Sequence, residues 1–130
     1  GGLICIGRRQ ITRIGCAGEI GVAPRVYVDA EGRIDTRTAR WLPGQGNLEV
    51  LPLHDFGGEH VALVRWPAGE RFQPHTHFGG EEILVLSGEF RDEFGGYPTG
   101  TWTRNPHMSR HHPFVDVPTV IWVKVGHLPG

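Results

Sequence analysis

Glycine and proline are spread along almost the whole chain, and their distribution constrains the fold more than any other feature. The 130 residues include 20 glycines and 10 prolines. Both residues interrupt helices, glycine through its backbone freedom and proline through its missing N–H and its fixed φ. They leave few gaps in which an uninterrupted helix could form. The sequence therefore predicts an all-β protein.

Short runs rich in β-branched and aromatic residues lie between turn-forming segments such as DAEG, PAGE and GGYPTG, as is typical of strands. The expected strands are LICI (3–6), RVYV (25–28), HVALVRW (60–66), EILVLSG (82–88), GEFRDEF (88–94), GTWTRN (100–105) and TVIWVKV (119–125). Side chains alternate along a strand, and both faces of HVALVRW are apolar, so we expect it to be at least partly buried on each side. Short strands at this spacing predict a sandwich or a barrel.

Length, charge and cysteine content exclude several classes of protein. A chain of 130 residues fits one globular domain. Its 13 basic and 14 acidic residues form no long run of like charge, which disfavours binding to nucleic acid or to an anionic membrane surface. The sequence contains neither a spanning apolar run nor a signal-peptide pattern, so a cytoplasmic location is expected. Cys5 and Cys16 are too few for a disulfide framework or a four-thiolate zinc site.

The segment HTHFGGEE, residues 75–82, carries the strongest functional signal. Residues two apart on a strand point the same way, so His75 and His77 can present their imidazoles to one point. The two glycines permit a turn, and the returning strand brings Glu81 to the side of the histidines. Imidazoles with a carboxylate suit zinc, iron, manganese, nickel or cobalt better than calcium or magnesium. We expect one divalent transition metal per chain, with Fe(II) or zinc foremost.

A fourth ligand is expected from SRHHPF, residues 109–114, where His111 and His112 are adjacent candidates. Adjacent residues of an extended chain face opposite ways, and Pro113 favours extended backbone at His112, so one of the two should reach the site. Plainer alternatives remain: solvated histidines at a strand end, an exposed Glu81 in a turn, or a metal-free barrel. The remaining histidines have no partner at ligand spacing and are expected to be ordinary polar residues: His54, His60, His107 and His127.

Aromatic residues on the expected strands are candidates for a ligand pocket, although such residues more often belong to the core. Arg104 lies two residues after Trp102, where it could hold an anionic ligand or pair with a surface carboxylate. The aromatic candidates are Trp66, Phe90, Trp102, Phe114 and Trp122, of which Trp102, Phe114 and Trp122, together with Arg104, are the predicted pocket residues.

The run PHTHFGGEEILVLSGEFRDEFGGYPTGTWTRNPHMSRHHPF, followed by IWVKVG, resembles the ChrR-like family of cupin domains. That family includes the metal-binding cupin of an anti-sigma factor and is similar to small dioxygenases of the acetylacetone-cleaving type. The resemblance implies a cupin jelly-roll barrel, or double-stranded β-helix, that commonly forms a homodimer. It assigns the cupin domain to residues 41–130. Residues 1–40 carry no family motif, and we expect them to form an arm or edge strands packed on the barrel.

By this resemblance the metal ligands are His75, His77, Glu81 and His111. The chain departs from many cupins at Thr103, where those members place a ligand histidine three residues after the Pro-x-Gly glycine. The ChrR-like group uses a later histidine in a Ser-x-His-x-Pro setting, and residues 109–113 fit it. The anti-sigma relatives carry a separate helical zinc-binding domain, and these 130 residues contain no segment like it.

Two classes of function follow from the resemblance. The first is a mononuclear, iron-type dioxygenase acting on a small molecule such as a diketone or a hydroxyacetophenone, which requires open positions on the metal. The second is a non-catalytic zinc-binding module with a structural or sensing role, in which four protein ligands close a tetrahedral site.

Overall fold

A computed structural model of the chain describes residues 10–13 and 25–129, and these contain strands and turns but no helix. In chain order the strands are β1 Gln10–Arg13, β2 Arg25–Val28, β3 Leu42–Pro43, β4 Glu49–Phe56, β5 Glu59–Trp66, β6 His75–Thr76, β7 Glu81–Ser87, β8 Glu89–Asp92, β9 Gly95–Pro98, β10 Trp102–Asn105, β11 Arg110–His111 and β12 Thr119–Val125. The described residues thus confirm the all-β prediction, and they offer no helix that could span a membrane.

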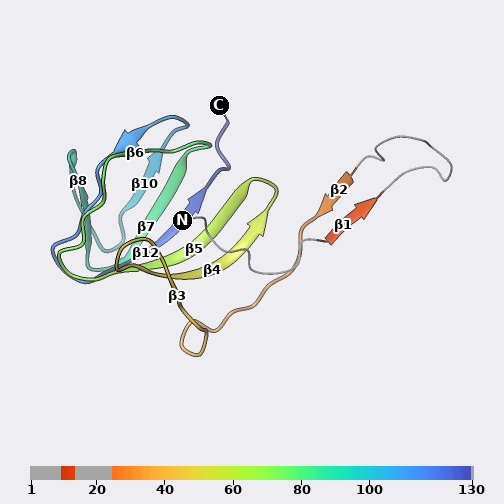
Figure 1. The fold of residues 1–130 in the computed structure, drawn as a ribbon, viewed down its shortest axis with the longest axis horizontal. Helices are drawn as coiled ribbons and strands as arrows, with labels where there is room; N and C mark the ends of the chain where they lie inside the picture. Colours follow the sequence, from red (N-terminus) through yellow and green to blue (C-terminus); the bar gives the residue numbers. More distant parts are fainter. Residues whose placement is uncertain (1–9, 14–24, 130) are drawn as a thin grey trace.

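The main layer is a six-stranded antiparallel sheet in the order β10-β7-β12-β5-β4-β3. The C-terminal strand β12 lies between β5 and β7, so the last part of the chain completes the middle of the sheet. The pairs β6–β11 and β8–β9 form the opposing layer (Figure 1). Bridges from Phe114 to Arg71 and to Arg91 join segments of this second layer. The two layers make a jelly-roll barrel.

The core fills the space between the layers with the inward faces of the central strands. On β7, Ile83 and Val85 are each 1% exposed, as expected for the face that continues from Glu81. The remaining members of the core cluster are Leu48, Ala62, Val64, Trp66, Phe90, Val115, Ile121 and Val123. Leu63, on the opposite face of β5, is also buried, which confirms that this strand is covered on both sides.

The strands expected at 60–66, 82–88, 88–94, 100–105 and 119–125 are all present, whereas β1, β3, β4 and β9 match no strand expected from the sequence. Pro52 obscures β4 in the sequence, because proline cannot donate to a sheet ladder. Two features of the sheet accommodate Pro52. On the β5 side, the register shifts between Pro52 and His54. On the other side, β3 pairs only with Glu49 and Val50, so Pro52 has no strand partner there among the described residues. The glycines of GGYPTG predict a turn, but its first four residues, GGYP, form β9.

The N-terminal region contributes a separate antiparallel pair, β1 with β2. The strand expected at 25–28 is therefore present, whereas the one expected at 3–6 lies outside the described residues. That residues 1–40 pack on the barrel as an arm stays a prediction.

Candidate metal centre

The turn between His77 and Glu81 brings the two halves of HTHFGGEE face to face. Gly79 and Gly80 both have positive φ, 76° and 71°. A Cβ at Gly79 would lie 2.6 Å from the Gly126 Cα, and one at Gly80 would lie 2.5 Å from Leu128 Cδ1. Both positions therefore require glycine, for the backbone conformation and for the close approach of the C-terminal segment.

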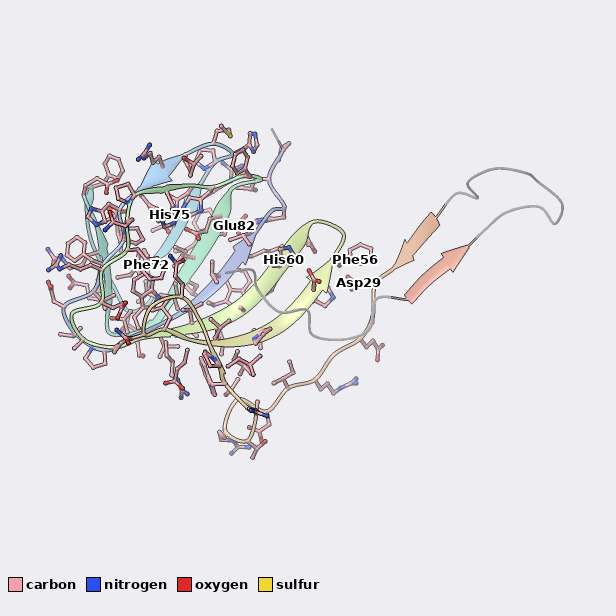
Figure 2. The ribbon with its side chains drawn as sticks, in the orientation of Figure 1. Asp29, Phe56, His60, Phe72, His75 and Glu82 are labelled. Carbon is pink, nitrogen blue, oxygen red and sulfur yellow. The ribbon has the colours of Figure 1, made fainter. Side chains whose placement is uncertain are left out.

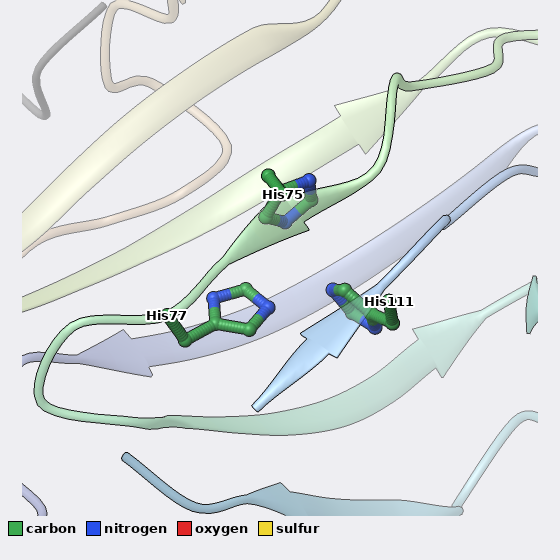
Figure 3. A group of neighbouring side chains, drawn as sticks. All are labelled: His75, His77 and His111. Atoms are coloured by element: carbon green, nitrogen blue, oxygen red, sulfur yellow. The ribbon is translucent and has the colours of Figure 1, made fainter. Parts of the chain in front are cut away.

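Pairing of β6 with β11 brings the third histidine to the site. His111 lies directly opposite His75 in this antiparallel pair. Just beyond β6, the His77 N–H donates to the Ser109 carbonyl at 3.0 Å, and the Met108 N–H donates to the His77 carbonyl at 2.8 Å. These bonds fix the two segments side by side, so all three rings turn toward one centre (Figure 3).

The three histidines form a compact donor cluster. One ring nitrogen from each of His75, His77 and His111 lies within 4.8 Å of the others. The ring centroids are 4.6 to 4.9 Å apart. The Glu81 Oε1 atom lies 3.4 Å from Nε2 of His77 and 3.6 Å from Nε2 of His111. The structure thus brings together all four residues expected as ligands.

Burial sets the protonation of this cluster. It lowers the pKa of His77 to about 4, with the charges of His111 and His75 adding to the effect. It also lowers the pKa of His111. Burial raises the pKa of Glu81 to about 8, although a hydrogen bond from the Asn105 side chain acts in the opposite direction. Near neutral pH these two imidazoles are neutral and can donate lone pairs, while Glu81 must release a proton to bind a cation.

The cluster fits a transition-metal ion. The Nε2 atom of His77 is buried and has no hydrogen-bond partner within the described part of the chain. An unpaired buried polar atom is costly, and a metal bond would satisfy it. The Nδ1 atom of His75 donates to the Gln73 carbonyl at 3.2 Å, which leaves its Nε2 free to bind. Neutral imidazoles with one carboxylate suit zinc, iron and their neighbours in the first transition row.

We expect the metal-free protein to lose stability between pH 6.5 and 8 because of Glu81. Burial raises the pKa of Glu81 from 4.5 to about 8, so the folded state keeps a proton that the unfolded chain has lost, and stability falls as the pH rises. The pKa of His77 is lowered from 6.5 to about 4, so its contribution rises with pH, but only up to about 6.5. Above pH 6.5 the Glu81 effect remains, about 2 kcal/mol over the window.

Urea unfolding of metal-free protein at pH 6.5 and 8 measures this loss. Glu81→Gln should abolish it. The matched control is Glu82→Gln on the same strand, because a hydrogen bond to His127 lowers the pKa of the Glu82 carboxyl and it does not titrate in this window. Equal pH dependence in the wild type and Glu81→Gln would contradict the assignment.

A small apolar cavity of about 120 Å³ lies beside the histidines. Phe72 and His75 both line it and lie close together (Figure 2), with ring centroids 6.3 Å apart. The cavity is lined by Leu48, Val64, Trp66, Phe72, His75, Glu81, Ile83, Phe90, His111, Pro113, Ile121 and Val123. The donor cluster therefore faces a hydrophobic space rather than a polar one.

The four residues expected to form a pocket do not lie at this cavity. Trp102 and Trp122 line a groove on the outer face of the main sheet together with Glu82, Leu84 and Leu86. Trp102 is 55% exposed there, because its register partner Leu84 points away from the core. Arg104 is also exposed, two residues further along β10. Phe114 packs under the guanidinium groups of Arg71 and Arg91.

Among the described residues, the remaining histidines do not belong to the three-histidine donor cluster. His60 pairs with Asp55 at the hairpin end of β4 and β5 (Figure 2). His107 accepts a hydrogen bond from the Gly79 N–H at 2.8 Å, and His127 contacts Glu82 at 2.8 Å. His112 is exposed, and its backbone N–H donates to Glu93.

Sequence reasoning missed Phe72 and Asn105 at the site, and it offered Phe90 only as one of several aromatic candidates. Phe72 and Phe90 line the cavity, and Asn105 holds the Glu81 carboxyl at 3.4 Å. The alternation along GEFRDEF does place Phe90 and Asp92 on one face, but it does not say that this face meets His111. The pairing of Asn105 with Glu81 depends on the register of β10 against β7, which the sequence does not display.

A profile of the ChrR cupin-like domain family matches residues 29–129. Among characterised proteins, the anti-sigma-E factor ChrR of Cereibacter sphaeroides is 38% identical over 81 residues, which make up 60% of this chain and 36% of that protein. The chain thus spans about a third of the length of this relative.

Solved structures place the fold among the cupins. ChrR of Rhodobacter sphaeroides, solved in complex with SigE, aligns with a TM-score of 0.64 and 25% identity over 70% of this chain and 51% of that one. A putative acetylacetone dioxygenase from Methylibium petroleiphilum aligns with a TM-score of 0.67 and 19% identity over 74% and 76% of the two chains. The second likeness concerns the fold alone.

Proposed function

Because the chain belongs to the ChrR cupin-like domain family, we propose that it is a small mononuclear metal-dependent dioxygenase acting on a diketone or hydroxyacetophenone-like molecule. The observation that carries the proposal is the apolar cavity of about 120 Å³ against the histidine cluster. Pockets for drug-sized ligands measure about 300–1,000 Å³, so this one suits a molecule of few non-hydrogen atoms. A purely structural metal site has no need of such a space.

The residues of the site have separate roles in this proposal. His75, His77, His111 and Glu81 would hold one divalent metal per chain, with Fe(II) or zinc foremost and Mn, Ni or Co as other candidates. Iron(II) would supply dioxygen activation for cleavage of a carbon–carbon bond. Phe72, Phe90 and the aliphatic lining exclude water and contact the apolar ends of the substrate. Because these apolar side chains keep water out, electrostatic contacts between the substrate and the metal-binding residues are stronger than they would be in water.

We expect the protein to bind about one transition-metal ion per chain, and the iron(II) form to consume dioxygen when a 1,3-diketone is present. The measurements are metal content after purification without chelator or metal resin, followed by oxygen uptake with a panel of diketones. A monoketone of equal size serves as the control substrate, because it lacks the second oxygen donor. A fully iron-loaded protein that takes up no oxygen with any of these compounds would contradict the proposal.

A second candidate is a zinc-binding module that serves a protein partner, and the position of Glu81 favours it. Its carboxylate lies within 3.6 Å of two of the histidines and would complete a closed set of four ligands. The sequence likeness to ChrR, an anti-sigma factor solved with SigE, points the same way. X-ray absorption of the loaded protein separates the two: four protein ligands without water favour the module, and added water or substrate oxygen favours the enzyme. A homodimer and a cytoplasmic location stay predictions in either case.

A further inference from the structure

Asp92 is a buried carboxylate beside one of the candidate metal ligands. It ends β8, and its side chain is 6% exposed. Its Oδ1 atom accepts two hydrogen bonds, from the Tyr97 hydroxyl at 2.8 Å and from the Phe94 N–H at 2.9 Å. Its Oδ2 atom lies 3.6 Å from Nδ1 of His111. The carboxylate is thus anchored through one oxygen and presents the other to the imidazole.

The two ring nitrogens of His111 face different neighbours. Nε2 lies 3.6 Å from Glu81, on the side of the donor cluster. Nδ1 is buried and has no hydrogen-bond partner among the described residues. A buried ring N–H without an acceptor is unfavourable, and Asp92 Oδ2 lies slightly beyond hydrogen-bond distance. A shift of a few tenths of an ångström in the ring would therefore make this bond.

We propose that Asp92, held in place by Tyr97, is the positioning residue for His111: it accepts a hydrogen bond from Nδ1–H and so leaves Nε2 unprotonated toward the metal. A carboxylate in this position fixes the tautomer and the ring orientation of a metal-binding histidine and makes it a stronger donor. The inference rests on the metal site of the proposed function, but it requires neither iron nor dioxygen chemistry.

Tyr97 is suited to its part in this arrangement. Burial and the neighbouring Asp92 raise the pKa of Tyr97 to about 12, so its hydroxyl keeps the proton that it donates. With Oδ1 occupied by Tyr97 and Phe94, the side chain of Asp92 cannot rotate away from His111 without losing two hydrogen bonds. His75 has a comparable arrangement, because its Nδ1 donates to the Gln73 carbonyl.

The tautomer of His111 tests the inference directly. Nitrogen-15 NMR of the metal-free wild type near neutral pH should show His111 with its proton on Nδ1. In Asp92→Asn, the Tyr97 hydroxyl and the Phe94 N–H still donate to this side chain, so they orient its amide oxygen toward themselves and its NH₂ group toward the His111 ring. Nδ1 of His111 must then accept a hydrogen bond, and the ring proton should move to Nε2. This is the wrong tautomer for binding a metal through Nε2. A wild-type His111 protonated on Nε2 would overturn the inference.

Metal affinity provides the second readout, by chelator competition with zinc. Asp92→Asn is expected to weaken binding about 10- to 100-fold, the usual cost of losing such a partner. Tyr97→Phe keeps the aromatic ring and the hydrogen bond from the Phe94 N–H to Asp92, so it should weaken zinc binding less. This variant preserves the test if Asp92→Asn fails to fold. The matched control is Asp116→Asn, an exposed carboxylate that pairs with Arg71 and Arg91 and should bind as the wild type does.

The outcomes separate this inference from the proposed function. Weakened zinc binding and a reversed tautomer in Asp92→Asn support the positioning role, even if no metal form consumes oxygen. Zinc affinity of Asp92→Asn and Tyr97→Phe equal to that of Asp116→Asn would overturn the role, even if the iron form proves to be a dioxygenase. A wild-type protein that binds no metal would overturn both.

Discussion

Replacement of His111 by alanine is expected to lower metal affinity by at least about a hundredfold, the upper end of what the loss of a supporting partner costs. His111 is 4% exposed, and its Nε2 atom faces the donor cluster. Removal of the imidazole takes away one of the three histidine donors of the cluster. The metal should bind weakly, through His75, His77 and Glu81 alone.

The neighbouring residue supplies the matched control. His112 is exposed and takes part in the structure through its backbone N–H, which donates to Glu93 and which alanine retains. His112→Ala should therefore leave metal affinity nearly unchanged. Metal stoichiometry and chelator competition on the two purified variants measure the difference. If His112→Ala lost the metal and His111→Ala kept it, His112 and not His111 would be the residue that faces the metal site.

The placement of these two histidines illustrates how far local sequence rules reach. Alternation along an extended chain requires His111 and His112 to face opposite ways, and one of them is buried while the other is exposed. The choice between them came from a family resemblance, since alternation alone does not say which face is inward. The same rule placed Glu81 on the buried face of β7 with Ile83 and Val85.

Sequence patterns were less informative where long-range register decides the outcome. Trp102 lies on the outer face of β10 because Thr103 pairs with Ile83 and Trp102 with Leu84, and that pairing is a property of two distant segments. Phe72 and Phe90, which line the cavity, come from a loop and from β8. Neither carries a local signal that distinguishes a cavity wall from an ordinary core residue. The predicted pocket residues accordingly do not line this cavity, whereas the four residues predicted as metal ligands lie together.

Loss of the Phe90 ring is expected to lower the free energy of unfolding by about 3–5 kcal/mol, the range for removal of a buried phenylalanine side chain. Phe90 is 2% exposed and packs edge-on against Trp66, with ring centroids 5.4 Å apart. Its other side faces His111 at a centroid distance of 6.4 Å. Phe90→Ala would therefore enlarge the cavity beside the metal cluster and remove a contact that limits the position of the His111 ring.

Phe94, four residues along the chain and 76% exposed, is the matched control, and Phe94→Ala should change stability by no more than about 0.5 kcal/mol. Urea unfolding of the metal-free variants measures the difference, and Phe90→Leu gives a milder truncation if Phe90→Ala does not fold. Zinc affinity should fall in Phe90→Ala and stay unchanged in Phe94→Ala. Without the Phe90 ring, the His111 side chain is less restricted in the metal-free protein, so ordering it on metal binding costs binding free energy. A loss of stability with unchanged zinc affinity would show that the backbone of β11 and the Asp92 carboxylate hold His111 without help from the core.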